Sequence, residues 1–291
     1  MSNTIDQWLT GFLAAERLPQ SYAEVVTKVA IPLADAIVAG RSATGQVVGI
    51  CGAQGSGKST LTAVVRRLLE ARGLRVASLS LDDLYLTRAQ RQVLAREVHP
   101  LLAVRGVPGT HDVALGQELL SALRRDGASL LPVFDKARDD RRPEGDIFEG
   151  PADVVLFEGW CVGACPQPQA ALADPVNALE AEEDADGRWR AYVNAELAGP
   201  YQDLFGAIDL LVLMQAPSFE VVREWRTEQE HKLGARLSRE GGDASKVMSD
   251  EAVARFIAHY ERLTRWILVE MPSRADLLVT LDAARRPVLR T

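Results

Sequence analysis

Residues 47–59 constrain this chain more than any other segment, because they join an apolar run to a glycine-rich loop: Val-Val-Gly-Ile-Cys-Gly-Ala-Gln-Gly-Ser-Gly-Lys-Ser. The loop has the spacing Gly52-x-x-x-x-Gly57-Lys58-Ser59, which is typical of a site for nucleotide phosphates. Glycines let the backbone take positive φ and bring its N–H groups close to an anion. We therefore expect Lys58 to contact the β- and γ-phosphates and the Ser59 hydroxyl to ligate Mg²⁺.

The apolar residues after this loop recur at helical spacing, which predicts a helix whose N-terminus lies beneath the phosphates. Strand, loop and helix all fit, so the segment predicts an enzyme that uses a nucleoside triphosphate. The residues predicted to bind the nucleotide are Gly52, Ala53, Gln54, Gly55, Ser56, Gly57, Lys58, Ser59 and Thr60.

Four further apolar runs predict short strands at residues 75–81, 153–157, 208–214 and 276–281. They show little polar alternation, which is typical of strands buried on both faces of a parallel sheet. With helical segments between them, they predict an α/β fold of the P-loop NTPase type, a doubly wound parallel sheet flanked by helices. Ligands bind such a sheet at the carboxyl ends of its strands.

The domain organisation predicted from these patterns is an N-terminal helical extension at residues 1–44 and one domain at 45–291. Long polar insertions at 82–112, 134–151 and 159–190 are predicted to serve function, since structureless loops of this length are uncommon.

Two polar stretches are expected at the surface. The acidic residues 177–186 predict a solvated loop, and residues 239–250 predict a flexible segment.

Composition limits the partners and the compartment. A net charge of −7 provides no general basic field for nucleic acid or an anionic membrane, and no apolar run of membrane-spanning length is present. The three cysteines are odd in number and form no disulfide framework, which predicts a reducing cytoplasm. The sequence does not give the oligomeric state.

Acidic residues follow two of the predicted strands. Asp82 and Asp83 come after residues 75–81, and Glu158 comes after 153–157. A carboxylate at this edge can accept a proton from a substrate hydroxyl or support Mg²⁺. We predict Asp82 as the base and Glu158 as the magnesium-supporting acid. The alternatives are that Asp82 and Asp83 only cap the next helix, or that Glu158 belongs to a structural hydrogen-bond network.

The segment Ser80-Leu81-Asp82-Asp83-Leu84-Tyr85 resembles one in P-loop kinases related to uridine kinase, phosphoribulokinase and bacterial pantothenate kinase. Further blocks extend the resemblance to the plant and fungal D-glycerate 3-kinase family: His99-Pro100-Leu101-Leu102, Arg105-Gly106-Val107-Pro108-Gly109-Thr110-His111-Asp112, Pro132-Val133-Phe134-Asp135-Lys136 and Phe157-Glu158-Gly159-Trp160. The resemblance implies phosphorylation of D-glycerate to 3-phosphoglycerate with ATP and Mg²⁺, and it makes Asp82 the catalytic base.

A small anionic acceptor requires an Arg or Lys for its carboxylate. Arg105 and Lys136 are the preferred candidates, whereas the cluster at 138–142 is balanced between substrate binding and a salt-bridged surface loop. The resemblance places residues 105–112 at the acceptor pocket. The predicted acceptor residues are Arg105, His111, Asp112, Asp135 and Lys136.

A lid is predicted at about residues 217–240. The resemblance implies that Arg226, and secondly Arg223, neutralise the transferring phosphoryl group, although both could instead pair with glutamates on a solvated helix. An alternative function keeps the kinase fold with another small hydroxylated acceptor, pantothenate-like, nucleoside or sugar. Tyr85 and Phe134 could stack on a nucleoside. A nucleotide-dependent switch is disfavoured, because the sequence lacks an Asn-Lys-x-Asp guanine motif.

Overall fold

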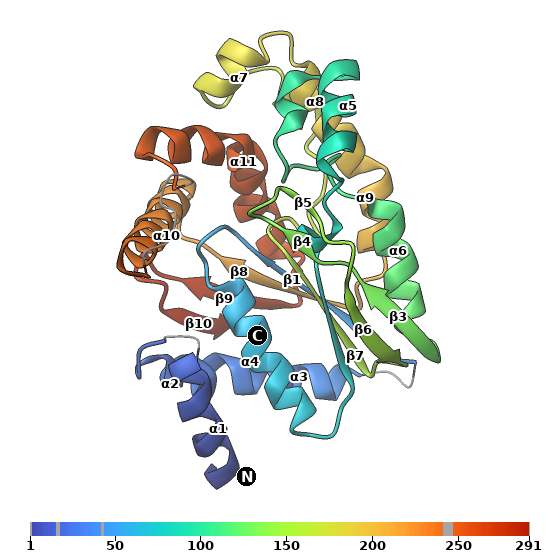
Figure 1. The fold of residues 1–291 in the computed structure, drawn as a ribbon, viewed down its shortest axis with the longest axis vertical. Coiled ribbons are helices and arrows are strands. Elements are labelled where there is room, and N and C mark those ends of the chain that lie inside the picture. Colours follow the sequence, from blue (N-terminus) through green and yellow to red (C-terminus); the bar gives the residue numbers. More distant parts are fainter. Residues whose placement is uncertain (1, 16–17, 42–43, 241–246, 291) are drawn as a thin grey trace.

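A computed structural model describes residues 2–15, 18–41, 44–240 and 247–290, and its centre is a six-stranded sheet with the order β10-β9-β8-β1-β7-β2 (Figure 1). Neighbouring strands are parallel except β10, which runs antiparallel to β9. The strands of this sheet are β1 (Gln46–Gly52), β2 (Val76–Ser80), β7 (Val154–Gly159), β8 (Leu210–Gln215), β9 (Leu277–Leu281) and β10 (Pro287–Arg290). The predicted doubly wound sheet is confirmed, while β10 was not predicted.

The register of the central strands sets the position of the site. Residues of β1 and β7 are buried along their whole length, because β1 lies between β7 and β8 and helices cover the sheet. Cys51 pairs with Gly159, and Ser80 pairs with Glu158. The carboxyl ends of β1, β7 and β2 therefore reach the same edge together.

Helices lie on both sides of the sheet (Figure 1). In this view α3 and α4 pack together below it, whereas α10 and α11 lie above β8 and β9. The α-helices are α1 (Ser2–Ala15), α2 (Tyr22–Val25), α3 (Ile31–Gly40), α4 (Lys58–Glu70), α5 (Arg88–Glu97), α6 (Val113–Ala122), α7 (Ala178–Glu183), α8 (Arg188–Ala198), α9 (Pro200–Phe205), α10 (Phe219–Glu240) and α11 (Asp250–Glu270).

The predicted N-terminal helices share the core of the sheet. Residues 26–30 form a π-helical turn between α2 and α3, and Val29, Leu33 and Ile37 are fully buried. All three belong to the same apolar cluster as the strands β1 and β7. This part of the chain therefore forms a packed layer beside α4.

The insertions contain more regular structure than the sequence predicted. Short 3₁₀ turns at Leu81–Leu84 and Pro100–Ala103 flank α5, and two antiparallel hairpins occupy much of residues 127–150. One hairpin pairs β3 (Gly127–Leu131) with β6 (Asp146–Gly150), and β4 (Phe134–Asp135) pairs with β5 (Asp140–Arg141) inside it. Among the described residues, two further 3₁₀ turns are Gln169–Leu172 and Met271–Ser273.

The prediction of a solvated acidic loop at 177–186 is wrong. Residues Ala178–Glu183 form α7, and Glu180 and Asp184 are fully buried. Glu180 pairs with Arg262 at 2.6 Å and Asp184 pairs with Arg190 at 3.0 Å, so the buried charges are compensated.

The predicted flexible stretch at 239–250 falls largely on residues 241–246, which lie outside the described residues. Arg239 belongs to α10, and Asp250 begins α11. Within the described part of the chain, every helix is too short or too polar to cross a lipid bilayer.

Candidate active site

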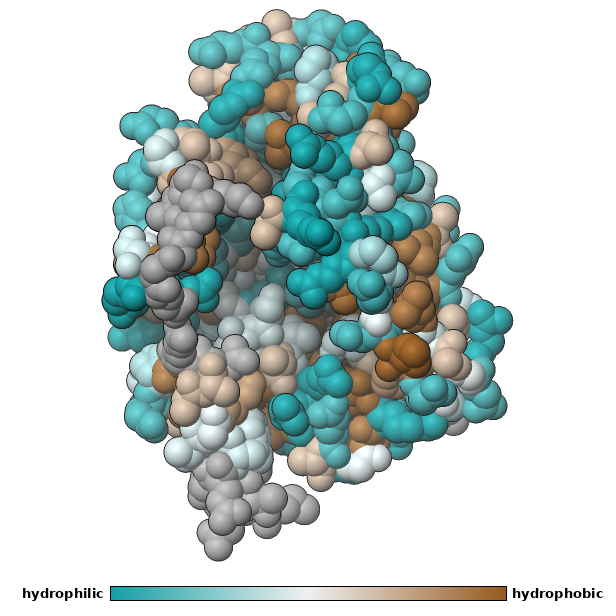
Figure 2. Space-filling view, in the orientation of Figure 1, coloured by the Kyte–Doolittle hydropathy of each residue, from teal (hydrophilic) through white to brown (hydrophobic). Residues whose placement is uncertain are grey.

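A cleft of about 430 Å³ opens where β1, β2 and β7 end. The glycine-rich loop, α10 and α11 all contribute residues to its lining. The face in Figure 2 is hollowed near its centre, and hydrophilic side chains gather beside the hollow over the β4–β5 region. The lining residues are Gly52, Ala53, Gln54, Gly55, Gly57, Lys58, Ser59, Thr60, Asp82, Tyr85, Arg105, Lys136, Trp160, Arg226, Gln229, Glu230, Leu233, Phe256 and Tyr260.

The glycine-rich loop has the backbone of a phosphate cradle. Gly55 has φ 78° and Gly57 has φ 84°, and Gly57 immediately precedes α4. The first N–H groups of a helix have no partner within it, so they are available to an anion. Among the described residues the buried Ser56 Oγ also has no hydrogen-bond partner. These groups fit a bound phosphate.

Glu158 lies against the start of α4. Its carboxylate forms an ion pair with Lys58 and accepts a hydrogen bond of 3.1 Å from Ser59 Oγ. The nearly buried charge of Glu158 is therefore compensated. The adjacent carboxylate and hydroxyl oxygens are also the donor types that Mg²⁺ prefers, so Ser59 and Glu158 fit a magnesium ion.

Asp82 faces the cleft. It accepts hydrogen bonds from Tyr85 Oη at 2.7 Å and from Lys136 Nζ at 2.5 Å. Burial acts to raise the pKa of Asp82, but the ammonium of Lys136, with smaller effects of Lys58 and Tyr85, outweighs it and lowers the pKa to about 2. Asp82 is therefore an ionised carboxylate at neutral pH.

Asp83 points away from the cleft, where it accepts a hydrogen bond of 3.0 Å from the backbone N–H of Phe134. Burial raises the pKa of Asp83. Of the two neighbouring aspartates, Asp82 lines the cleft and Asp83 is not among its lining residues.

Arg105 and Lys136 both line the cleft near Asp82. Arg105 forms an ion pair with Asp139, and its guanidinium lies 5.5 Å from the centre of the Phe134 ring. Asp139 also binds the fully buried Arg91 at 2.5 Å. Asp139 thus fixes the guanidinium of Arg105 to a rigid part of the protein.

Two cations of the 138–142 cluster, Arg141 and Arg142, have structural partners. Arg141 donates to Asp112 at 3.0 Å and to backbone carbonyl groups, and Arg142 lies 3.7 Å from Asp135. These contacts favour the salt-bridged interpretation for Arg141 and Arg142.

Three predicted acceptor residues do not line the cleft. Asp112 caps the N-terminus of α6 by accepting a hydrogen bond from Leu115 N at 3.1 Å. Asp135 accepts hydrogen bonds from backbone N–H groups in its own turn. Their carboxylates are therefore occupied locally.

His111, the third of these residues, is buried behind the cleft wall. Its ring stacks on Tyr85 with centres 4.8 Å apart, and its Nδ1 lies 2.6 Å from the hydroxyl of Tyr201. Burial lowers the pKa of His111 to about 3, so the ring is neutral. Phe134, considered above for nucleoside stacking, is not among the residues that line the cleft; its ring centre lies 5.8 Å from the guanidinium of Arg91 and 5.5 Å from that of Arg105.

The helix α10 presents Arg226, but not Arg223, to the cleft. Arg226 pairs with Glu230 at 2.7 Å and lies over the ring of Phe256. Arg223 lines a separate hollow with Thr227. On a helix Arg223 is rotated by about 40° from Thr227 and about 60° from Arg226, so it follows the outer face.

Six lining residues were not among the predicted site residues: Trp160, Gln229, Glu230, Leu233, Phe256 and Tyr260. Trp160 follows Glu158-Gly159 directly, and this position was a usable signal. Phe256 and Tyr260 are four residues apart on an amphipathic helix, a spacing that predicts burial without showing against what.

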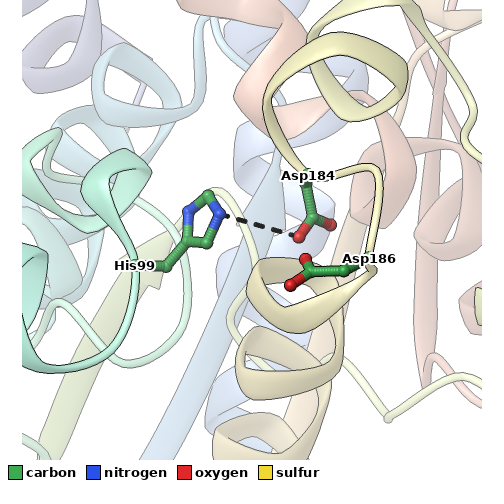
Figure 3. Close-up of side chains that lie close together, drawn as sticks. All are labelled: His99, Asp184 and Asp186. Atoms are coloured by element: carbon green, nitrogen blue, oxygen red, sulfur yellow. Dashed lines mark ion pairs between the residues drawn. The ribbon is translucent and has the colours of Figure 1, made fainter.

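A second group of titratable side chains lies away from this cleft. Figure 3 shows His99 directed towards Asp184, with Asp186 beside them, and His99 Nε2 lies 3.8 Å from Asp184 Oδ1. Asp184 already accepts hydrogen bonds from Trp189 N at 2.7 Å and from Arg190. Its carboxylate therefore holds α7 to the start of α8.

Comparisons with known proteins identify relatives of this chain. A family profile described as methylmalonyl Co-A mutase-associated GTPase MeaB matches residues 21–85, which contain β1, α4 and β2. The chain is 35% identical over 265 residues to the uncharacterized kinase mug58 of Schizosaccharomyces pombe, covering 84% of this chain and 90% of that protein.

It is 32% identical over 264 residues to the chloroplastic D-glycerate 3-kinase of Arabidopsis thaliana, covering 84% of this chain and 54% of that protein. The solved D-glycerate 3-kinase of Cryptococcus neoformans matches with a TM-score of 0.73 at 28% identity, covering 90% of this chain and 98% of that one. The fold and the resemblance predicted from the sequence are confirmed. The chain therefore belongs to the P-loop kinase family of mug58, and within that family it is similar to the D-glycerate 3-kinases.

Proposed function

We propose that this kinase transfers the γ-phosphoryl group of ATP to D-glycerate and forms 3-phosphoglycerate and ADP. The observation that carries the proposal is that Asp82, Arg105 and Lys136 line the same cleft as the phosphate cradle. A hydroxy acid needs a base for its hydroxyl and cations for its carboxylate. The relatives named as D-glycerate 3-kinases support this choice of acceptor.

The acceptor carboxylate is assigned to Arg105 and Lys136. Arg105 is held by Asp139 and by the backbone, since the Tyr260 hydroxyl donates to the carbonyl oxygen of Arg105 at 2.9 Å. Lys136 is the more exposed of the two cations. A planar guanidinium held in place and an ammonium on a long side chain together suit a small carboxylate that must enter and leave.

Asp82 is assigned as the general base. Its carboxylate takes the proton as the acceptor O–H bond breaks and the acceptor oxygen bonds to the γ-phosphorus. The bond between the γ-phosphorus and the bridging oxygen breaks, and its electron pair leaves with ADP. Lys58 and Arg226 line the cleft on either side and are assigned to the charge on the phosphoryl group.

Ser59 and Glu158 are the residues that would hold Mg²⁺, because their oxygens lie together at the cradle. When bound, the ion neutralises charge on the phosphates and so lowers the cost of their approach. Lys58 forms an ion pair with Glu158. For Glu158 to bind the ion, Lys58 must leave this ion pair and contact the phosphates.

An assay of ADP release with D-glycerate, L-glycerate, pantothenate, uridine and glycerol tests the proposal. We expect ADP formation with D-glycerate, and phosphorus NMR of the product identifies the phosphorylated hydroxyl. Lys58→Met serves as the inactive control. Turnover confined to pantothenate, uridine or glycerol would refute the glycerate assignment while leaving the kinase class intact.

A further inference from the structure

The turn between β9 and β10 contacts the phosphate cradle, although no role was predicted for this part of the chain. In Figure 1 the β9–β10 hairpin lies below α10. Arg285, in this turn, donates a hydrogen bond from Nε to the carbonyl oxygen of Gly55 at 2.8 Å. The C-terminal hairpin is thus joined to the loop that must hold the phosphates.

The same side chain also holds α10. Arg285 Nη2 lies 2.5 Å from Glu228 Oε2, and its guanidinium lies 5.2 Å from the centre of the Trp225 ring. Trp225 is buried, and its indole N–H donates to the carbonyl oxygen of Ala283 at 2.8 Å. Because Arg226 follows Trp225 directly, these contacts also determine where the cleft-lining cation lies.

The contact with Gly55 fixes one peptide plane of the cradle. The C=O of the Gly55–Ser56 peptide accepts from Arg285, and the N–H of the same peptide donates to Ala53 O at 3.2 Å. A peptide unit is planar, so holding both of its polar groups prevents it from rotating. A loop with several glycines gains most from such a restraint, because glycine has the greatest backbone freedom.

Two further features show how closely these segments fit. A Cβ atom at Gly55 would lie 2.6 Å from the Cβ of Trp225, so the loop and α10 touch at the backbone. Arg285 itself has φ 61°, a left-handed conformation that is unfavourable for a residue other than glycine or asparagine. Backbone strain of this kind persists only where the surroundings enforce it.

We propose that Arg285 is a positioning residue for the nucleotide site, which braces the Gly55–Ser56 peptide and holds α10, with Arg226, in register with the cradle. This role concerns the ATP half of the cleft and does not depend on which acceptor is used. Arg285 acts through Gly55 and Trp225, so its loss disorders the arrangement of the phosphate-binding N–H groups.

Titration calorimetry of ATP binding without an acceptor tests the role. Arg285→Gly removes the side chain but suits the left-handed backbone, so we expect the Tm to stay within a few degrees while the Kd for ATP rises roughly tenfold. Arg285→Lys keeps one donor and should recover part of the affinity. Arg286→Ala is the matched control, since Arg286 pairs only with Asp282 on the same exposed turn among the contacts described.

The inference is overturned if Arg285→Gly binds ATP with the wild-type Kd. It is also overturned if Arg286→Ala weakens binding equally, or if Arg285→Gly lowers affinity only in proportion to a large loss of Tm. With any acceptor that the wild type phosphorylates, its KM at saturating ATP should stay within about twofold in Arg285→Gly. An ADP-release panel that fails with D-glycerate leaves this test unaffected.

Discussion

Replacement of Lys136 by methionine should raise the pKa of the proposed base, Asp82. Lys136 Nζ lies 2.5 Å from Asp82 Oδ2, and the side chains of Asp82 and Lys136 are 30% and 61% exposed. Burial alone raises the pKa of Asp82, and Lys136 provides the largest opposing effect, which brings the pKa to about 2. Without the ammonium of Lys136, the weaker effects of Lys58 and Tyr85 oppose the rise that burial causes in the pKa of Asp82.

The size of this change follows from the geometry. Two unit charges about 4 Å apart interact by about 4 kcal/mol at an effective dielectric constant of about 20. The exposure of Lys136 reduces this to roughly 1.5–3 kcal/mol through solvent screening. At about 1.4 kcal/mol per pH unit, the pKa of Asp82 should rise from about 2 to between about 3 and 4 in the variant.

The sign of the pH effect is determined by the charge of Asp82. A base must be ionised, so the acid limb of kcat/KM should move to higher pH in Lys136→Met. Stability follows the same linkage: a lowered pKa of Asp82 in the folded state stabilises the protein above the unfolded-state pKa, and this contribution is lost as the pH falls towards about 2. The variant should therefore lose less unfolding free energy between pH 7 and pH 3 than the wild type.

Quenched assays of kcat/KM from pH 2.5 to pH 8 measure how far the acid limb moves, and urea unfolding at pH 7 and pH 3 measures the linkage. Arg138→Met is the matched control, because it removes a positive charge from the same hairpin and Arg138 is not among the groups that set the pKa of Asp82. The reasoning fails if the acid limbs of Lys136→Met and wild type coincide, or if Arg138→Met moves the limb as far.

Three further variants test the rest of the site. Asp82→Asn should lower kcat roughly 10²- to 10⁴-fold with an unchanged Kd for ATP, measured by rapid-quench turnover and calorimetry. Asparagine tolerates the φ of 58° at position 139, so Asp139→Asn keeps the backbone conformation but loses the ion pair with Arg105. This variant should raise the acceptor KM about tenfold, whereas the control Asp140→Asn should leave it unchanged. Gly106→Ala should destabilise the protein by about 2–4 kcal/mol in urea unfolding, because its Cβ would lie 2.0 Å from a tyrosine hydroxyl and its φ is 128°.

The nucleotide half of the site could be predicted from the sequence because its chemistry is local. The cradle residues 52–60 are consecutive, and strand and helix periodicity on either side fixes their direction. Asp82 and Glu158 could also be placed: Glu158 lies on β7, which pairs with β1, and Asp82 follows β2, which pairs with β7. Because parallel strands end at the same edge of the sheet, residues that follow different strands in the sequence lie close together in the fold.

The acceptor half could be predicted only in part, because it depends on which way each side chain points. Arg105 and Lys136 reach the cleft, whereas Asp112 caps α6 and Asp135 binds its own turn. All four are polar residues in similar segments, and the sequence carries no signal of these local hydrogen bonds. Arg223 likewise differs from Arg226 only in its angle around α10.

Contacts between helices that are distant in the sequence could not be predicted. Glu180 and Arg262 lie 82 residues apart and form a buried ion pair, so an acidic stretch that reads as solvated is partly interior. Phe256 and Tyr260 line the cleft because α11 packs on α10. A run of charged residues shows which charges need partners, and apolar periodicity shows which helix face must be buried. Neither pattern shows which segment provides the partner.

Among the described residues, each of the four cations that line the cleft is paired with a carboxylate: Lys58 with Glu158, Lys136 with Asp82, Arg105 with Asp139 and Arg226 with Glu230. Anionic ligands must therefore exchange with internal carboxylates instead of meeting free cations. If the γ-phosphate takes Lys58, Glu158 becomes available to Mg²⁺; if the acceptor carboxylate takes Lys136, Asp82 loses the partner that lowers its pKa most. Asp82, which is a weak base while it is paired with Lys136, should then become a stronger base when the acceptor is bound. Proton transfer would therefore depend on the acceptor, and this dependence limits hydrolysis of ATP by water.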